Sequence, residues 1–144
     1  MNIFIYLSCY FLLLLSTLGY GNFFKKIFFK SEKFDIGYIG IFGIFLLIII
    51  AYVFNFFIPL SPIFSLIVFF LGISFFINFL LESFTSYKKE LLTLFVLSVF
   101  LIVFILTAKN HDDFPYYHFP YISLLSEFSN SLGIGNFNHG FRTP

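Results

Sequence analysis

Charged residues are scarce in this chain, and tryptophan is missing altogether. Only 10% of the 144 residues are charged, whereas 60% are hydrophobic. A soluble domain carries about 25% charged residues, so this chain cannot easily build a surface that faces water. The formal net charge of +1 also provides no basic face of the kind that nucleic acid requires. We therefore expect the lipid bilayer as a partner and no nucleic acid.

Cysteine is also nearly absent, because Cys9 is the only one in the chain. A single cysteine excludes an internal disulfide. Cys9 lies inside an apolar run and lacks the basic start that a lipoprotein cysteine needs. We therefore interpret it as a buried cysteine that packs as a small hydrophobic residue.

Long apolar runs dominate what is present. Four of them approach or exceed the 20 or so residues that a transmembrane helix needs, and none contains Lys, Arg, Asp or Glu. They cover residues 2–20, 36–58, 63–81 and 91–108. A charge at the centre of such a helix would cost about 2.5–3.5 kcal/mol. The fold class is therefore expected to be all-α, with a four-helix transmembrane region over residues 1–108.

Lysines indicate which loops face the cytoplasm. Two loops, one after the first run and one after the third, contain six of the seven lysines: Lys25, Lys26, Lys30, Lys33, Lys88 and Lys89. By the positive-inside rule, both loops are cytoplasmic. The N-terminus, the turn at residues 59–62 and the segment after residue 108 are then expected outside.

Glycine and asparagine are the notable residues within the apolar runs. Gly37, Gly40 and Gly43 recur every three residues and could form a face for close helix packing. The spacing differs from the four-residue GxxxG step, so ordinary small residues of a membrane helix are the favoured interpretation. Asn55 and Asn78 most need polar partners, and both lie near run ends, where water or headgroups can satisfy them.

Residues 109–144 are more polar and follow the last run. Apolar residues recur at steps of three and four between Pro120 and Leu132, a pattern typical of an amphipathic helix. Thirteen residues at about 1.5 Å each are too short to cross a bilayer, so this helix is expected to lie in the outer interface. No closing span follows, and we expect the chain to be a fragment of a longer protein.

The outer segment opens with adjacent acids and many aromatic rings. One interpretation is an aromatic belt at the membrane boundary, with Asp112 and Asp113 capping a helix or facing water. The alternative is chemical, because two adjacent carboxylates repel each other unless a cation or a donor lies between them. Such a pair could bind a divalent metal and a diphosphate, or one Asp could accept a proton.

The hexapeptide from Asp112 to Tyr117 reads Asp-Asp-Phe-Pro-Tyr-Tyr. At the outer end of an apolar run, it resembles the first outer loop of GT-C-type glycosyltransferases, polytopic enzymes that use lipid-linked sugar donors. The resemblance implies that Asp112 is the base and Asp113 its metal- or phosphate-side partner. It also implies that Tyr116 and Tyr117 line the donor or acceptor groove.

The histidines complete the candidate site. His111 and His118 lie close enough in sequence to assist the two acids. His118 and the segment 136–140, which contains His139, resemble those of uncharacterised multi-pass bacterial proteins of the same broad type. All three histidines are therefore candidates for substrate binding. The resemblance also implies a place in a bacterial cytoplasmic membrane.

Three functions remain open from the sequence. The first is a glycosyltransferase that uses a polyprenyl-phosphate sugar at the outer face of the membrane. The second is an O-antigen polymerase or ligase, which would rely more on arginines than this chain allows, since Arg142 is its only one. The third is a non-enzymatic polytopic membrane protein. Transport is disfavoured because the four runs contain no ionisable residue of the kind that marks an ion pathway.

Overall fold

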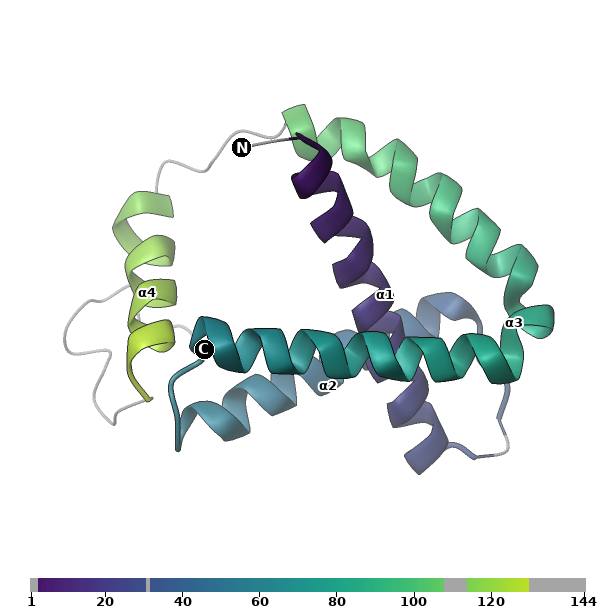
Figure 1. The fold of residues 1–144 in the computed structure, drawn as a ribbon, viewed down its shortest axis with the longest axis horizontal. Coiled ribbons are helices and arrows are strands. Elements are labelled where there is room, and N and C mark those ends of the chain that lie inside the picture. The colour runs from purple at the N-terminus through teal and green to yellow at the C-terminus, as the bar shows by residue number, and fades with distance from the viewer. Residues whose placement is uncertain (1–2, 31, 108–113, 130–144) are drawn as a thin grey trace.

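The computed structural model describes residues 3–30, 32–107 and 114–129, and this part of the chain contains helices and no strand (Figure 1). Its elements, in chain order, are α1 (Ile3–Phe28), α2 (Ile36–Asn55), α3 (Pro62–Thr107), the short π-helical turn η1 (Phe114–His118) and α4 (Phe119–Glu127). The all-α prediction is confirmed. Three of the helices, α1, α2 and α3, are long and apolar enough to cross a membrane.

The boundaries of α1 and α2 differ from the expected spans. The first helix continues past the predicted end at Tyr20 as far as Phe28. Its last turn contains Lys25 and Lys26, whose charges are favourable at a helix C-terminus. The second helix ends at Asn55, three residues before the predicted end, because a proline soon follows and the residue before a proline avoids the helical conformation.

The third and fourth predicted spans belong to one helix, α3. The segment 82–90 between them, expected as a loop, is helical throughout, and it contains neither glycine nor proline to end the helix. At about 1.5 Å per residue, the 46 residues of α3 extend to roughly 69 Å. Figure 1 shows that α3 bends sharply near its midpoint, so that its second half runs back across the molecule.

Small residues bring α1 against the first half of α3. A Cβ atom added to Gly19 would overlap the carbonyl oxygen of Gly72, and one added to Gly72 would overlap the hydroxyl of Ser16. The Ser16 hydroxyl donates a hydrogen bond to the carbonyl of Phe69 at 3.1 Å. Such close approach of backbones is how membrane helices gain packing energy without help from water.

The contact between α1 and α2 also depends on glycines that let the two backbones approach closely. A Cβ atom on Gly43 would overlap the carbonyl of Thr17, and one on Gly21 would overlap the carbonyl of Ile39. Of the three periodic glycines in this helix, only Gly43 is in close packing. A Cβ atom added to Gly40 would make an ordinary contact with one leucine side chain, and one added to Gly37 would lie in open space.

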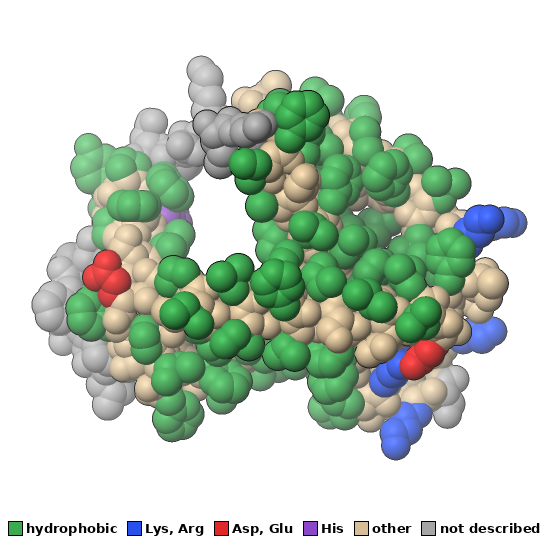
Figure 2. All heavy atoms as spheres, in the orientation of Figure 1, with side chains coloured by type: hydrophobic (Ala, Val, Ile, Leu, Met, Phe, Trp, Pro, Cys, Tyr) green, Lys and Arg blue, Asp and Glu red, His purple; other side chains and the backbone are tan. Residues whose placement is uncertain are grey.

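Most of the surface of α1, α2 and α3 is apolar and exposed. Figure 2 shows hydrophobic side chains over the middle of the molecule, with the basic side chains at its right-hand edge. Cys9 is exposed on α1, which corrects the expectation that it would be buried. An apolar exposed surface of this kind is what a helix presents to lipid in a bilayer.

The fourth helix is tied to the turn between α2 and α3. The backbone N–H of Leu60 donates a hydrogen bond to the carbonyl of Leu125 at 2.8 Å. The side-chain amide of Asn55, which is buried, contacts the carbonyls of Leu125 and Phe128, each at 3.4 Å. A buried amide therefore has protein partners here, and the sequence-based view that water or headgroups satisfy Asn55 is wrong.

The glycine contacts predict that alanine substitutions at different glycines change the free energy of unfolding in opposite directions. Gly72→Ala and Gly43→Ala should each lower the free energy of unfolding by about 1–3 kcal/mol, because the added methyl group overpacks a helix contact. Gly37→Ala should raise it by about 0.5–1 kcal/mol, since alanine favours a helix where the methyl group has room. Unfolding of the protein in detergent micelles, followed by circular dichroism, measures these changes. Three shifts of the same sign would contradict the packing.

The Asn55 contacts predict that its removal frees α4. Asn55→Leu should increase amide hydrogen exchange in residues 119–129 by about tenfold, the equivalent of losing about one hydrogen bond. Thr93→Val is the matched control, because the Thr93 hydroxyl bonds only within its own helix, to the carbonyl of Lys89. Unchanged exchange in Asn55→Leu, measured by mass spectrometry, would show that α4 does not depend on this amide.

Candidate functional site

The described residues include only part of the site expected from the sequence. Tyr116, Tyr117 and His118 lie together in η1. His111, Asp112, Asp113 and His139, the other candidates, lie outside the described residues, as does the possible metal site at the two aspartates. Their catalytic, metal-binding and substrate-binding roles therefore stay predictions.

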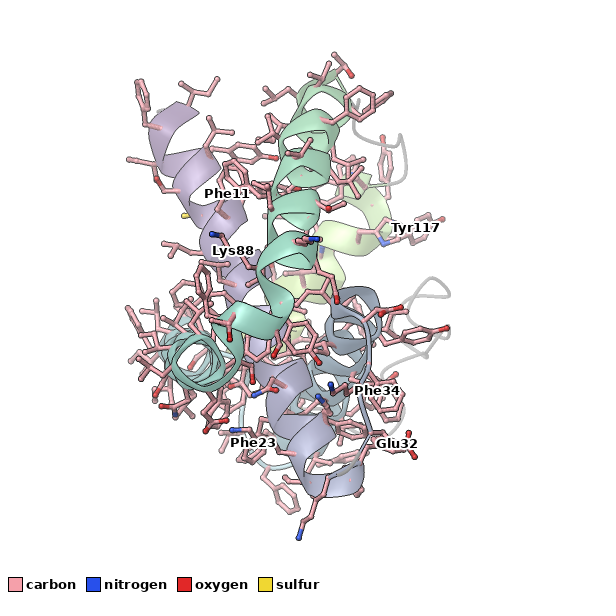
Figure 3. All side chains as sticks on the ribbon, turned by 90° about the vertical axis from the view of Figure 1, so that its right-hand side faces the viewer. Phe11, Phe23, Glu32, Phe34, Lys88 and Tyr117 are labelled. Atoms are coloured by element: carbon pink, nitrogen blue, oxygen red, sulfur yellow. The ribbon has the colours of Figure 1, made fainter. Side chains whose placement is uncertain are left out.

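The aromatic rings of η1 are open to their surroundings. Tyr116 is 70% exposed and Tyr117 is 41% exposed, and Figure 3 shows Tyr117 pointing away from α1 and α3. The ring of Phe114 lies 6.4 Å from that of His118 and 6.3 Å from that of Phe119. This exposed group of rings suits a membrane boundary, where aromatic residues concentrate. It also leaves the tyrosine hydroxyls available to a substrate.

The helix that follows is shorter than the pattern predicts. It begins at Phe119 and ends at Glu127, with Phe128 in an extended conformation, whereas the pattern predicted a helix over residues 120–132. Pro120 lies in its first turn, where a missing N–H costs no hydrogen bond. The bonds to the α2–α3 turn come from Leu125 and Phe128 at the C-terminal end of α4, whereas η1 runs into its opposite, N-terminal end.

A second polar site lies at the other edge of the molecule. We call it the lysine junction and define it by side chains from the end of α1 and the middle of α3: Lys25, Lys26, Glu82, Tyr87 and Glu90. Figure 3 looks onto the bend of α3, with Lys88 in front and Phe34 and Glu32 on the connector from α1 to α2. From the sequence these lysines indicated only the orientation of the loops, and their contacts with α3 were not predicted.

Tyr87 is the centre of the lysine junction. It is only 8% exposed, and its hydroxyl donates a hydrogen bond to the carbonyl of Phe34 at 3.0 Å. The same hydroxyl accepts a hydrogen bond from the Nζ atom of Lys25 at 3.2 Å, and this ammonium group lies 5.6 Å from the centre of the ring. Tyr87 thereby connects α3 to α1 and to the connector.

Two carboxylates of α3 complete the junction. Glu82 forms an ion pair with Lys26. Glu90 accepts a hydrogen bond from the backbone N–H of Ile36 at 2.7 Å, which satisfies one of the free donors at the start of α2. Asp35 precedes that helix but makes no capping bond with its side chain. The cap of α2 is therefore supplied by a distant helix and not by its neighbour in sequence.

The lysine junction borders a cavity of about 340 Å³ that carries charges of both signs. The walls are the following residues: Lys25, Lys33, Phe34, Asp35, Ser83, Ser86, Tyr87 and Glu90. Within the described residues, no three His, Cys, Asp or Glu side chains come together as a metal site would require. Ammonium groups, carboxylates and hydroxyls in one cavity can instead bind a polar group that is itself charged.

One signal in the sequence could have indicated that α3 continues through the junction. Apolar or small residues recur at steps of three and four across the polar segment: Phe76, Leu80, Ser83, Tyr87, Leu91, Leu94 and Ser98. A stripe of this period is typical of an uninterrupted helix. The charges at residues 82–90 concealed it, because a cluster of charges between apolar runs was interpreted as a loop.

Comparison with known proteins identifies a family but no function. A family model described as a domain of unknown function, DUF8201, matches residues 2–141. No curated protein and no solved structure matches the chain. Because the family model covers nearly the whole sequence, the chain belongs to the DUF8201 family.

Proposed function

We propose that this chain is a four-span protein of the bacterial cytoplasmic membrane that acts in the transfer of a sugar from a polyprenyl-phosphate donor at the outer face. The observation that carries the proposal is the hexapeptide from Asp112 to Tyr117. It follows the apolar α3 and enters η1 and α4, which are attached to the α2–α3 turn. A segment that is both acidic and aromatic in sequence, next to an apolar helix, suits a lipid-linked substrate.

Four crossings are supported by the length and chemistry of α3. A helix of roughly 69 Å is more than twice the hydrocarbon thickness of about 30 Å. Its middle segment contains two lysines and two glutamates, whereas the halves on either side are apolar. The bend near this segment (Figure 1) lets each half cross the bilayer once, with the charged residues at the surface.

The placement of the lysines supports the orientation. In Figure 2 the basic side chains gather at the right-hand edge, whereas α4 lies at the left. Lys25 and Lys26 of α1 bond to the middle of α3 at the lysine junction, and Lys33 of the connector lines the adjoining cavity. If this end is cytoplasmic by the positive-inside rule, the α2–α3 turn and α4 are outside, where a polyprenyl-phosphate sugar would be used.

The proposed chemistry is general base catalysis. Asp112 accepts the proton of an acceptor hydroxyl as its oxygen attacks the anomeric carbon, and the bond from that carbon to the phosphate oxygen breaks. Asp113, alone or with a divalent metal, stabilises the phosphate that leaves on the polyprenyl carrier. Tyr116, Tyr117 and His118 border the substrate from η1, with His111 and His139 as further substrate contacts.

One observation supports a second candidate, a non-enzymatic role. The exposed rings of η1 match an aromatic belt, in which tyrosines need only anchor the segment at the headgroups. Asp112 and Asp113 would then face water and carry no reaction. An O-antigen polymerase or ligase has weaker support, because Arg142 is the only arginine in the sequence.

The catalytic role predicts a selective loss of activity. Asp112→Asn should lower the rate of sugar transfer by about 10²–10⁴-fold, the usual contribution of a general base, while the amount of protein in the membrane stays unchanged. The assay supplies undecaprenyl phosphate carrying glucose, mannose or galactose to membranes that contain the protein. Glu32→Gln, an exposed acid on the connector, is the matched control. Full activity of Asp112→Asn, or transfer with none of the donors, would refute the proposal.

The topology can be tested independently of the reaction. In a Cys9→Ser background the chain has no cysteine, so Phe57→Cys at the α2–α3 turn and Lys88→Cys at the bend each introduce one reactive thiol. A membrane-impermeant maleimide should label the first in intact cells and the second only after the membrane is opened. Phe57 is 78% exposed, so a thiol there is accessible. Labelling of both in intact cells would contradict four crossings.

A further inference from the structure

We propose that a groove extending from the lysine junction along α1 and α2 binds one phospholipid whose headgroup carries both a phosphate and a primary amine. The inference concerns the end of the molecule away from α4 and does not depend on sugar transfer. It rests on three adjoining cavities, on the signs of the charges in the first, and on two glycines in the walls of the last.

The three cavities form one continuous groove. The polar cavity of about 340 Å³ shares Asp35 and Glu90 with a second of about 370 Å³. The second shares Ile36, Gly37 and Leu94 with a third of about 430 Å³. Because neighbouring cavities share wall residues, we infer that a single molecule extends from the first cavity into the third.

Polarity falls along the groove. Lysines, acids and serines line the first cavity, whereas the third is lined almost wholly by apolar residues of α1 and α2. Between Ile36 and Ile44 the groove follows about eight residues of α2, or roughly 12 Å. A charged head followed by an apolar channel of this length matches a phospholipid with one acyl chain in the groove.

The apolar part exists because two glycines leave it open. No atom lies within 4 Å of a Cβ atom built on Gly37, and only the Leu18 side chain comes that close at Gly40, at 3.8 Å. Gly43 of the same helix is packed against α1. The periodic glycines thus divide into one that holds two helices together and two that provide room beside them.

The charges at the polar end favour a zwitterionic headgroup. Lys25 and Lys33 provide ammonium groups for a phosphate, and Asp35 and Glu90 provide carboxylates for an amine. Lys25 and Glu90 each already make one hydrogen bond, but an ammonium group has three donors and a carboxylate about four acceptor positions. The two lysines and two carboxylates of this cavity balance in charge, so a headgroup with a phosphate and no amine would leave a net negative charge beside the carboxylates, which like charges disfavour.

The test compares three lipids by native mass spectrometry of the purified protein released from detergent. They are phosphatidylethanolamine, with phosphate and amine; phosphatidylglycerol, with phosphate and no amine; and dioleoylglycerol, with neither. The wild-type protein should retain phosphatidylethanolamine about tenfold more than phosphatidylglycerol, the equivalent of one charged hydrogen bond. Dioleoylglycerol should be retained least.

Substitutions at the polar end and at the apolar end of the groove test the two parts of the site separately. Asp35→Asn should remove the preference for phosphatidylethanolamine without unfolding α2, because the Asp35 side chain makes no capping bond. Lys33→Gln should weaken both phospholipids by about tenfold, through loss of one charged hydrogen bond. Gly37→Leu, which fills open space in the groove, should weaken both as well.

Ala51→Leu is the control for Gly37→Leu, since it adds a larger side chain to the same helix in a different groove. All variants are compared at equal monodispersity on size exclusion, and Asp35→Asn tests the site even if Gly37→Leu does not fold. Equal retention of the three lipids would mean a non-specific lipid shell and would overturn the proposal. So would a preference for phosphatidylglycerol, or an Asp35→Asn protein that keeps the wild-type preference.

Discussion

The close approach of α1 to both of its neighbours is the contact on which the rest of the structure depends. Inside a bilayer, apolar side chains gain little by leaving lipid for protein, so helices associate through tight packing and through hydrogen bonds. Gly19 and Gly72 provide that contact between α1 and α3, and Gly43 provides it between α1 and α2. With α1 fixed between them, α2 and α3 need few contacts of their own.

The two ends of the bundle are held by polar groups rather than by glycines. At one end Tyr87 and Glu90 of α3 bond to the connector and to the start of α2. At the other, Asn55 and Leu60 bond to α4. Each of these bonds joins groups that the bilayer could not satisfy in its hydrocarbon interior. Charged residues are rare in this chain, and in the described part they gather where helices begin, end or bend.

Much of the helical fold was predictable because lipid allows few alternatives. A segment in the hydrocarbon must satisfy its own backbone groups, and a helix does so locally, so apolar runs predicted α1, α2 and both halves of α3. The continuity of α3 was missed because residues 82–90 combine the charges of a loop with the periodicity of a helix. For the site, the sequence identified Tyr116, Tyr117 and His118 as candidates, and the structure places them together in η1.

The sequence by itself determined that the chain is helical and apolar, where its lysines lie and which aromatic residues follow the two aspartates along the chain, because these depend on residues near one another in the chain. The tertiary structure alone decided that Glu90 caps α2, that Asn55 holds α4, and that Gly43 packs while Gly37 leaves a groove. Those roles depend on which helices are in contact and on where along their lengths the contact lies. The same glycine or amide serves packing, binding or neither according to what lies opposite it.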